Sequence, residues 1–242
     1  MAGKVVIFGG SGGIGAETAR RLAGRGYGLH LVGRNETALA AVAAETGASH
    51  ALADVTDPAA VAAAVAAAGE SIAGLVYAVG TITLKPLSRL GAAEMERDFR
   101  INALGAALAV QAALPALKAH GAGASVVLFS TVAVAQGFPS HASVALAKGA
   151  VEGLTRALAA ELAPAVRVNA IAPSLTRTAL AKSFTDNPQM AAAIAGMHPL
   201  QRLGTPEDAA ALATFLISEE AGWITGQVIG VDGGRATLRT KG

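Results

Sequence analysis

The residues whose types and spacing most clearly suit a chemical task form the segment 9–15, which reads Gly-Gly-Ser-Gly-Gly-Ile-Gly. It follows an apolar run that predicts a strand and leads into a predicted helix. Glycines allow the backbone to turn tightly and to approach a pyrophosphate, whose charge then lies on the amides at the helix N-terminus. Two spacings fit, G-x-G-x-x-G from Gly10 and G-x-x-x-G-x-G from Gly9, and a glycine turn without a ligand is the alternative. The residues assigned to the nucleotide are Gly9, Ser11, Gly12, Gly13, Ile14 and Gly15.

The ends of the next two expected strands indicate which dinucleotide would bind. Gly33 stands where a carboxylate would accept hydrogen bonds from the adenosine ribose and repel a 2′-phosphate, and the planar fork of Arg34 can pair with a phosphate. These two residues favour NADP(H) over NAD(H), with a solvated arginine at a helix start as the alternative. Asp54, followed by Val55, could hydrogen-bond the adenine amino group or equally serve as a polar cap on the strand end.

Short β-branched runs alternate with long alanine-rich stretches of helical character. Most of the runs are continuously apolar, as expected where both faces of a parallel sheet are covered. The alternation predicts an α/β fold, a single doubly wound Rossmann-type domain over residues 1–242 with a seven-stranded parallel sheet and helices on both faces. The expected strands are residues 4–8, 28–32, 49–53, 74–77, 124–130, 167–171 and 227–230.

Two helix starts carry clear signals. Asp57-Pro58 places an N-cap before a proline at the first helical position, and Thr205-Pro206 does the same with two carboxylates following near the helix dipole. Long helices are expected around 91–119 and 140–163. The stretch 173–203 contains Asn-Pro and His-Pro and is too long for an ordinary connection, so we expect an irregular substrate loop there.

Composition excludes several classes of protein. The chain of 242 residues is 52% hydrophobic and 15% charged, which fits one folded domain. Cysteine is absent and the five histidines lack ligand spacing, so neither thiol chemistry nor a metal site is expected. A net charge of +2 on dispersed side chains predicts no nucleic-acid surface. We see no apolar run of bilayer-spanning length and no signal segment, so we expect a cytoplasmic protein that does not contact membranes.

The chain resembles the classical short-chain dehydrogenase/reductase (SDR) family over nearly its whole length. The resemblance rests on the glycine loop, on Asp54-Val55, Asn102, Lys148 and Pro173, and on three longer strings. These strings are V-N-A-I-A-P at 168–173, R-L-G-T-P-E-D at 202–208, and I-T-G-Q with V-D-G-G between 224 and 234. Such motifs are specific for the fold and far less specific for the substrate. The resemblance implies a nicotinamide cofactor and a homo-oligomer, a dimer or tetramer, paired through the two long helices.

The same resemblance implies a catalytic set with one member missing. In that family a tyrosine exchanges a proton with the substrate oxygen, a lysine four residues later lowers the tyrosine pKa and holds the nicotinamide ribose, a serine orients the substrate and an asparagine supports a water. By position, Lys148 is the lysine, Asn102 is the asparagine and Thr131 stands at the serine. The tyrosine position is Val144. Neither of the two tyrosines in the chain has a lysine four residues later, so a displaced copy is excluded.

Further cofactor contacts follow from the resemblance. Tyr77-Ala78-Val79-Gly80 stands where the family usually has Asn-Asn-Ala-Gly, and Ala78 and Gly80 still allow the cofactor to approach. Tyr77 is expected to pack in the core, because a side chain at that strand end should point away from the cleft. Pro173 and Thr178 match the residues that meet the nicotinamide.

The missing acid affects the proton rather than the hydride. Hydride transfer depends on the cofactor and its orientation, whereas general acid catalysis, typically worth ~10²–10⁴-fold, is what Val144 cannot supply. Four substitutes are open: His141, Lys148, Thr131 and water. On a continuous helix His141 would share a face with Val144 and Lys148. However, Pro139-Ser140 predicts the helix start, so the alternative is a surface histidine near an N-cap.

Two hypotheses about function remain. The first is an NADP(H)-dependent oxidoreductase that acts on a small carbonyl or alcohol substrate with a non-standard or impaired proton donor. The second is a non-catalytic nucleotide-binding homologue that acts as a sensor, a scaffold or a partner subunit. In either case the apolar residues of the expected loop indicate a partly hydrophobic ligand; these are Leu175, Leu180, Phe184 and Met190.

Overall fold

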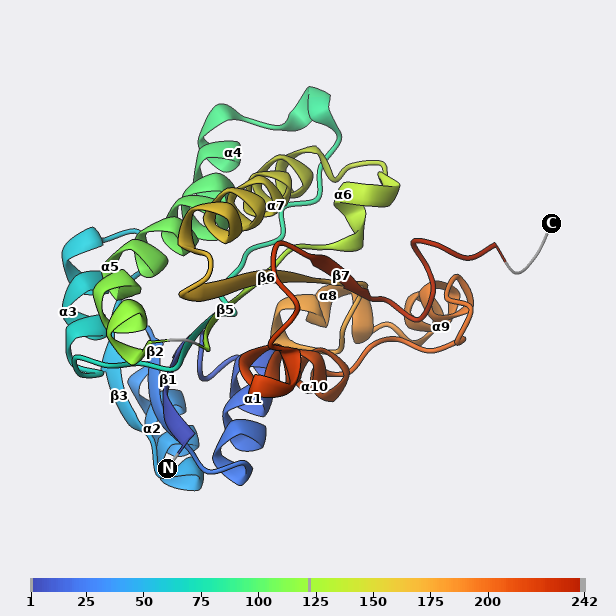
Figure 1. Ribbon diagram of the computed structural model, residues 1–242. Coiled ribbons are helices and arrows are strands. Elements are labelled where there is room, and N and C mark those ends of the chain that lie inside the picture. Colours follow the sequence, from blue (N-terminus) through green and yellow to red (C-terminus); the bar gives the residue numbers. More distant parts are fainter. Residues whose placement is uncertain (1, 122, 240–242) are drawn as a thin grey trace.

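Seven parallel strands form one sheet in the order β3-β2-β1-β4-β5-β6-β7 (Figure 1). The computed structural model describes residues 2–121 and 123–239. Every expected strand is present, with ends within two residues of the predicted ones, and the predicted fold class is confirmed. The strands are β1 (Ala2–Phe8), β2 (Tyr27–Gly33), β3 (Ser49–Leu52), β4 (Gly74–Tyr77), β5 (Ala124–Phe129), β6 (Val166–Pro173) and β7 (Val228–Val231).

Helices cover both faces of this sheet. In Figure 1, α3, α4, α5 and α7 lie on one face, and α1, α2 and α10 lie on the other. The first layer consists of α3 (Pro58–Ala66), α4 (Ala92–Phe99), α5 (Gly105–His120) and α7 (Ala142–Leu162). The second consists of α1 (Gly13–Gly24), α2 (Glu36–Thr46) and α10 (Pro206–Ile217), and the short α6 (Val132–Gln136) follows β5.

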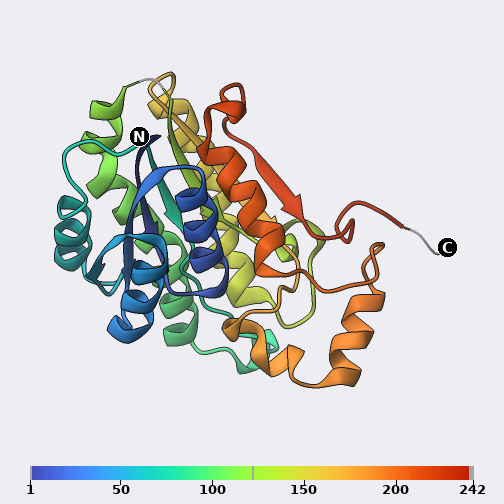
Figure 2. The same cartoon turned by 90° about the horizontal axis from the view of Figure 1, so that it is seen from below.

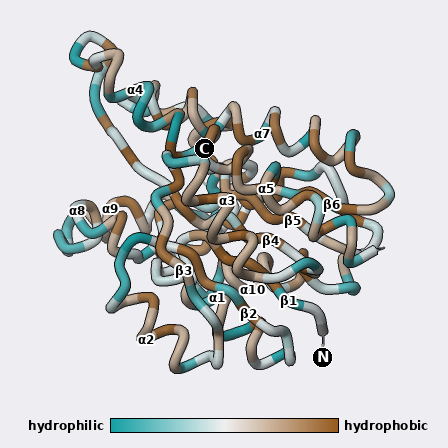
Figure 3. The backbone as a smooth tube through the Cα atoms, turned by 90° about the vertical axis from the view of Figure 1, so that its left-hand side faces the viewer, coloured by the Kyte–Doolittle hydropathy of each residue, from teal (hydrophilic) through white to brown (hydrophobic). Residues whose placement is uncertain are grey.

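The sheet separates two apolar cores. Strand side chains alternate between the faces, so Val6 and Phe8 of β1 enter the core beneath α5, whereas Val5 and Ile7 enter the core beneath α1 and α10. All four side chains are fully buried. Figure 3 shows the matching hydropathy, with hydrophobic strands inside and hydrophilic segments in the outer loops. Burial on both faces explains why inner strands such as β4 and β5 are nearly continuous apolar runs that were recognisable in the sequence.

The two predicted helix caps are confirmed. The Asp57 carboxylate accepts hydrogen bonds from the backbone of Ala59 and Ala60 at 2.9 and 3.2 Å, and Pro58 occupies the first turn of α3. At α10 the Asp208 carboxylate accepts from the Thr205 backbone N–H at 2.8 Å. Capping of this kind satisfies amides that the helix itself leaves unpaired.

Residues 173–203 are not an irregular loop as predicted. They fold into a 3₁₀ turn at Ala179–Ala181 and two helices, α8 (Lys182–Thr185) and α9 (Pro188–Gly196), which project from the body in Figure 2. The reason is local: Asn187 caps α9 by accepting from the backbone of Gln189 and Met190, and Pro188 fits its first turn. The Asn-Pro pair therefore starts a helix rather than interrupting one.

α7 begins two residues after its predicted start, and the alternative that places His141 at the N-cap rather than on the helical face is confirmed. The helix begins at Ala142, and His141 is its N-cap with φ −102° and ψ 11°. Ser140 has φ +65°, a left-handed conformation that a helix cannot contain. His141 therefore does not continue the helical face of Val144 and Lys148, although its side chain reaches the same cavity.

The helix from Ala92 to His120 corrects a further expectation, because by length and composition alone it is long and apolar enough to cross a membrane. It joins α4 and α5 through a π-helical segment, Arg100–Leu104. Half of its most apolar stretch is buried in the domain, where Ala106, Ala109 and Ala113 pack into the core. This packing accounts for its apolar character, as in the core helix of a globular domain.

Candidate active site

A cavity of about 540 Å³ lies where β4, β5 and β6 end. The carboxyl ends of parallel strands are the usual ligand position in open α/β sheets. Eight residues predicted for the site line this cavity together with Val144: Ile14, Ala78, Gly80, Thr131, His141, Lys148, Pro173 and Thr178. The other predicted residues do not line it: Gly9, Ser11, Gly12, Gly13, Gly15, Arg34, Asp54, Val55 and Asn102.

The glycine loop is shaped by close approaches of its own backbone. Gly9 has φ +77°, and its carbonyl accepts a hydrogen bond from the Gly12 N–H at 2.9 Å. A Cβ on Gly15 would lie 2.2 Å from the Gly9 oxygen, and a Cβ on Gly13 would lie 2.9 Å from the Thr178 methyl. In the spacing G-x-x-x-G-x-G, the local backbone or its neighbours therefore require glycine at Gly9, Gly13 and Gly15.

The N-terminus of α1 fits a phosphate group. Gly12 is the N-cap and has no side chain to bond the first amides, and no acidic residue lies in the first turn. Those amides and the positive end of the helix dipole are thus available to an anion. Ile14, in the same turn, lines the cavity. A dinucleotide with its pyrophosphate at α1 and its nicotinamide in the cavity fits the residues present.

The residues predicted to meet the adenosine lie at the ends of β2 and β3. The Arg34 guanidinium is 3.7 Å from the Asp54 carboxylate, and their side chains are 74% and 46% exposed. Asp54 also accepts from the Thr56 backbone and hydroxyl at 2.9 and 2.7 Å, bonds that lower the pKa of its carboxyl. Asp54 therefore caps a turn, and its partner Arg34 is open to a phosphate. Val55 is buried and packs against Gly105.

Lys148 is buried on α7 and points at the carboxyl end of β5. Its ammonium donates to the Phe129 carbonyl at 2.8 Å, and burial lowers its pKa to about 8. Val144, one turn earlier and 4% exposed, forms the adjoining part of the cavity wall. The arrangement places a titratable amine beside an apolar surface.

Asn102 lies in the π-helical segment, a distortion often found at functional sites. Its amide nitrogen donates to the Thr81 hydroxyl and to the Asp98 carbonyl, both at 2.8 Å, and its oxygen accepts from the Thr81 N–H at 3.3 Å. A Cβ on Gly80 would lie 3.0 Å from that oxygen and 3.4 Å from the Lys148 nitrogen. Gly80 therefore allows Asn102 and Lys148 to approach from two sides.

Asp98 is a buried carboxylate that was not expected from the sequence. One oxygen accepts from Thr81 and Thr83 at 2.7 and 3.1 Å, and the other accepts from Ser143 at 2.6 Å. These hydrogen bonds tie α4 to α7 directly beside Val144 and satisfy the carboxylate in the interior. Its position one helical turn before Asn102 was the available signal, but its partners come from distant parts of the chain.

Ser130 and Thr131 follow β5, and their hydroxyl groups differ in the hydrogen bonds that they make. The Ser130 hydroxyl donates to Glu152 at 2.8 Å, so its proton is engaged. Thr131 is the N-cap of α6, and its oxygen accepts from the Ala133 N–H at 3.3 Å, while its own proton has no acceptor among the described residues. Thr131 is therefore the better placed of the two to donate to a substrate oxygen.

Two aromatic candidates from the sequence have different surroundings. His141 has Nδ1 2.8 Å from the Pro139 carbonyl, which can only accept, so Nδ1 carries a proton and donates there. Tyr77 is 2% exposed, its hydroxyl donates to the Ile101 carbonyl at 2.6 Å, and burial raises its pKa. The prediction that Tyr77 packs in the core is confirmed.

Further cavity residues were missed because distant segments bring them together. His198 has Nδ1 2.8 Å from the Ile194 carbonyl and Nε2 2.8 Å from the Ser174 hydroxyl, and Ser174 lines the cavity. Arg235, from the segment after β7, also lines it and lies over the Phe138 ring. Within residues 2–121 and 123–239, no group of three or more His, Cys, Asp or Glu side chains could hold a metal ion.

Comparison with known proteins agrees with this geometry. A family model described as enoyl-(acyl carrier protein) reductase matches residues 9–236. Galactitol 2-dehydrogenase (L-tagatose-forming) of Cereibacter sphaeroides is 39% identical over 94% of this chain and 92% of its own. The inactive 2-(S)-hydroxypropyl-CoM dehydrogenase 2 of Xanthobacter autotrophicus is 36% identical over 91% of this chain and all of its own. The crystal structure of a variant of actinorhodin polyketide ketoreductase with NADPH superimposes with a TM-score of 0.92 at 25% identity, over 98% of each chain.

Proposed function

Because the chain belongs to the short-chain dehydrogenase/reductase family, we propose that it is an NADP(H)-dependent oxidoreductase that acts on a small carbonyl or alcohol substrate without the family's tyrosine. One observation carries this proposal: a single cavity collects Lys148, Thr131 and the end of the glycine loop, and Val144 fills the wall beside them. The relatives named as a galactitol dehydrogenase and a polyketide ketoreductase support alcohol and ketone chemistry.

Residues that follow the carboxyl ends of several strands would hold the cofactor. The first turn of α1 would bind the pyrophosphate, and residues lining the cavity would surround the nicotinamide, which supplies or accepts the hydride when bound. The preference for NADP(H) rests on Arg34, whose guanidinium is exposed, and on Gly33, which offers no carboxylate to repel a 2′-phosphate. A similar structure that contains NADPH supports it.

We assign the proton to Lys148. A pKa of about 8 leaves the ammonium mostly protonated at neutral pH and lets it exchange a proton there. One of its N–H groups is bonded to the Phe129 carbonyl, and the other two can serve a substrate oxygen directly or through a water beside Val144. The Thr131 hydroxyl would orient the same oxygen.

Cofactor titration followed by a substrate panel tests this function. Wild type should bind NADPH more tightly than NADH, and Gly33→Asp should reverse the order, because Gly33 is the position at which a carboxylate repels the 2′-phosphate. Addition of carbonyl or alcohol substrates to the loaded protein should change the nicotinamide absorbance. Tighter binding of NADH by wild type would contradict the cofactor assignment, and a silent panel would contradict the enzymatic one.

A non-catalytic role is the second candidate. It is favoured by the apolar side chain of Val144 beside Lys148 and by a relative of similar length whose name states that it is inactive. A nucleotide-binding sensor, scaffold or partner subunit would need the phosphate-binding first turn of α1, but it would not need a group that transfers a proton. In that case Lys148→Ala would have the same background activity as wild type while both still bound NADPH.

We further propose a cytoplasmic homo-oligomer that contacts neither nucleic acid nor membrane. The long helices present large apolar side chains to the outside: Phe99 and Leu104 are each 41% exposed and Leu146 is 56% exposed. Pairing of α5 and α7 between subunits would cover them. Light scattering should therefore give a dimer or tetramer for wild type and a smaller species for Leu146→Glu, whereas a monomeric wild type would contradict the proposal.

A further inference from the structure

Arg235 places at the cavity a positive charge that the proposed reaction does not use. Its guanidinium carbon lies 4.7 Å from the centroid of the Phe138 ring, and both residues line the cavity. The hydrogen-bond acceptor of its side chain is the Met197 sulfur at 3.4 Å, which is a weak acceptor. Most of the five N–H groups of this guanidinium therefore have no strong acceptor among the described residues.

No described carboxylate neutralises this guanidinium. No ion pair with an Asp or Glu within 4.0 Å joins its nitrogens in residues 2–121 and 123–239, and the oxygens of nearby Asp232 accept from the backbone N–H groups of Gly234 and Ala236 at 2.9 and 2.8 Å. Partial burial lowers the pKa of Arg235, yet a guanidinium stays charged at any working pH. A partly dehydrated cation without a counter-ion is unfavourable until a ligand supplies the anion.

The rest of the cavity favours an anion with an apolar body. Its lining includes no Asp or Glu, and besides His141 its basic side chains are Lys148 and Arg235. Aliphatic and aromatic groups from separate segments form much of the remaining wall, among them Leu84 and Phe184. A cavity of one charge sign with apolar walls raises the local concentration of oppositely charged ligands.

We propose that Arg235 binds a carboxylate of the substrate, so that the substrates are oxo acids or hydroxy acids with a partly apolar chain. The planar fork of the guanidinium matches a carboxylate in two parallel hydrogen bonds. The carbonyl of the same molecule would lie at Lys148 and Thr131. This inference rests on the proposed function and adds the chemical class of its substrate.

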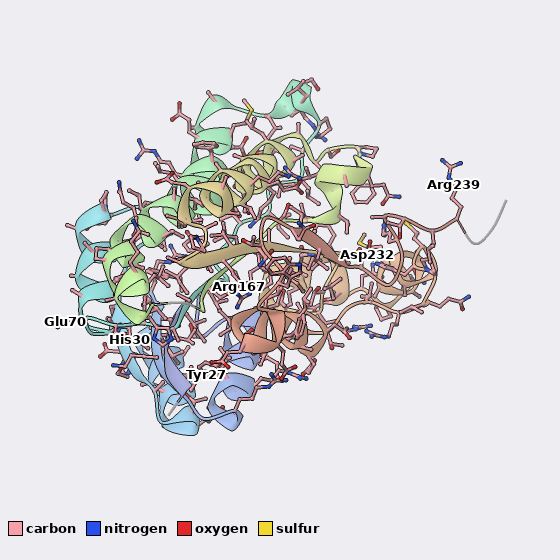
Figure 4. All side chains as sticks on the ribbon, viewed as in Figure 1. Tyr27, His30, Glu70, Arg167, Asp232 and Arg239 are labelled. Atoms are coloured by element: carbon pink, nitrogen blue, oxygen red, sulfur yellow. The ribbon has the colours of Figure 1, made fainter. Side chains whose placement is uncertain are left out.

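Paired substrates test the assignment. Aliphatic oxo acids of about four to eight carbons and their methyl esters are compared as substrates of wild type, Arg235→Met, Arg235→Lys and Arg239→Met with NADPH. Arg239 is the matched control, since it is exposed and lies on the outer C-terminal segment in Figure 4, away from the cavity lining. A charge-assisted pair predicts at least about tenfold higher kcat/KM for the best acid than for its ester in wild type. Arg235→Met should lose this preference through a lower kcat/KM for the acid, Arg235→Lys should keep part of it, and Arg239→Met should keep all of it.

Calorimetry with the same oxo acids separates this inference from the proposed function. If wild type binds the best acid and Arg235→Met binds it at least about tenfold more weakly, the anion site stands even when no turnover occurs, and only the enzymatic proposal fails. If wild type has the same kcat/KM for the esters as for the acids, the inference is overturned and the enzymatic proposal remains. The same holds if Arg235→Met keeps the preference for acids. Absence of both binding and turnover of every acid overturns the inference as well.

Discussion

At the scale of single residues, Val144 and Lys148 decide how a proton could reach the substrate. With valine one turn before it, Lys148 has no phenol to activate, and its ammonium faces an apolar wall. Removal from water disfavours the charged amine, which is why its pKa falls to about 8. The side chain that in the family supports the acid is thereby suited to be the acid itself.

The pH dependence of turnover should report this role. For carbonyl reduction, kcat/KM should be level below about pH 8 and fall above it, because the ammonium that donates the proton is lost. Alcohol oxidation should rise through the same range, since it needs the free amine. Steady-state rates of wild type and Lys148→Met, measured against pH in both reaction directions, test this expectation. A wild-type profile without a transition near pH 8 would contradict the role of Lys148 as the proton donor.

The same group should make stability depend on pH. Its pKa is about 8 in the folded protein and returns to its ordinary value of 10.5 in the unfolded chain, so between these values the unfolded chain binds more protons and stability rises with pH. Below about pH 8 Lys148 is protonated in both the folded and the unfolded protein, and its buried charge lowers the free energy of unfolding by its full amount. Lys148→Met should therefore be more stable than wild type at pH 7, with a difference that shrinks toward pH 10.5. Urea unfolding measures this, and a difference that grows with pH would refute it.

Restoring a phenol should increase turnover. In Val144→Tyr the new hydroxyl would face the cavity on the same side of α7 as Lys148, and a positioned general acid is worth about 10²-fold or more. The measurement is kcat for an accepted ketone, with Val144→Phe as the control for ring size. Equal rates for the two variants would show that proton transfer does not limit the reaction.

At the scale of elements, the close backbone packing of the glycine loop, residues 9–15, should control how well the loop binds the nucleotide. Gly15→Ala should destabilise the fold by about 1–3 kcal/mol and weaken NADPH binding, because its Cβ would meet the Gly9 oxygen at 2.2 Å. Gly24→Ala in the same helix is the matched control, since nothing lies within 4 Å of its Cβ. That control should bind NADPH normally and be as stable as wild type or more so. Similar affinities for the two variants, measured by calorimetry, would contradict the role of the loop.

Elements with strong local signals were predictable, and others were not. Inner strands such as β4 and β5 carry nearly continuous apolar runs because both faces are buried, and Asp57 and Asp208 cap helices with local hydrogen bonds. α7 begins two residues later than predicted because Ser140 adopts φ +65°, which its sequence does not signal. In the predicted loop, Asn187-Pro188 was interpreted as a break although the same pair caps α9.

At the scale of the whole molecule, the sheet brings distant residues to one cavity, and this is where prediction from sequence ends. Family motifs predicted Lys148, Thr131 and the glycine loop, and the cavity brings together Lys148, Thr131 and Ile14 of that loop. The bond from Ser143 to Asp98 joins residues 45 apart, and Phe138 meets Arg235 only through the fold. No local pattern in the sequence encodes such contacts. The buried carboxylate of Asp98 and the place of Arg235 in the cavity lining therefore became visible only in the structure.

The proposed function places a nucleotide and an unusual proton donor in one cavity, and turnover tests both at once. The most direct measurement is the rate of NADPH oxidation by wild type and Lys148→Met over a panel of ketones and oxo acids. We expect wild type to consume NADPH above the enzyme-free rate with at least one substrate, and Lys148→Met to lose that activity. Equal background rates for both proteins, with NADPH bound to each, would contradict the account.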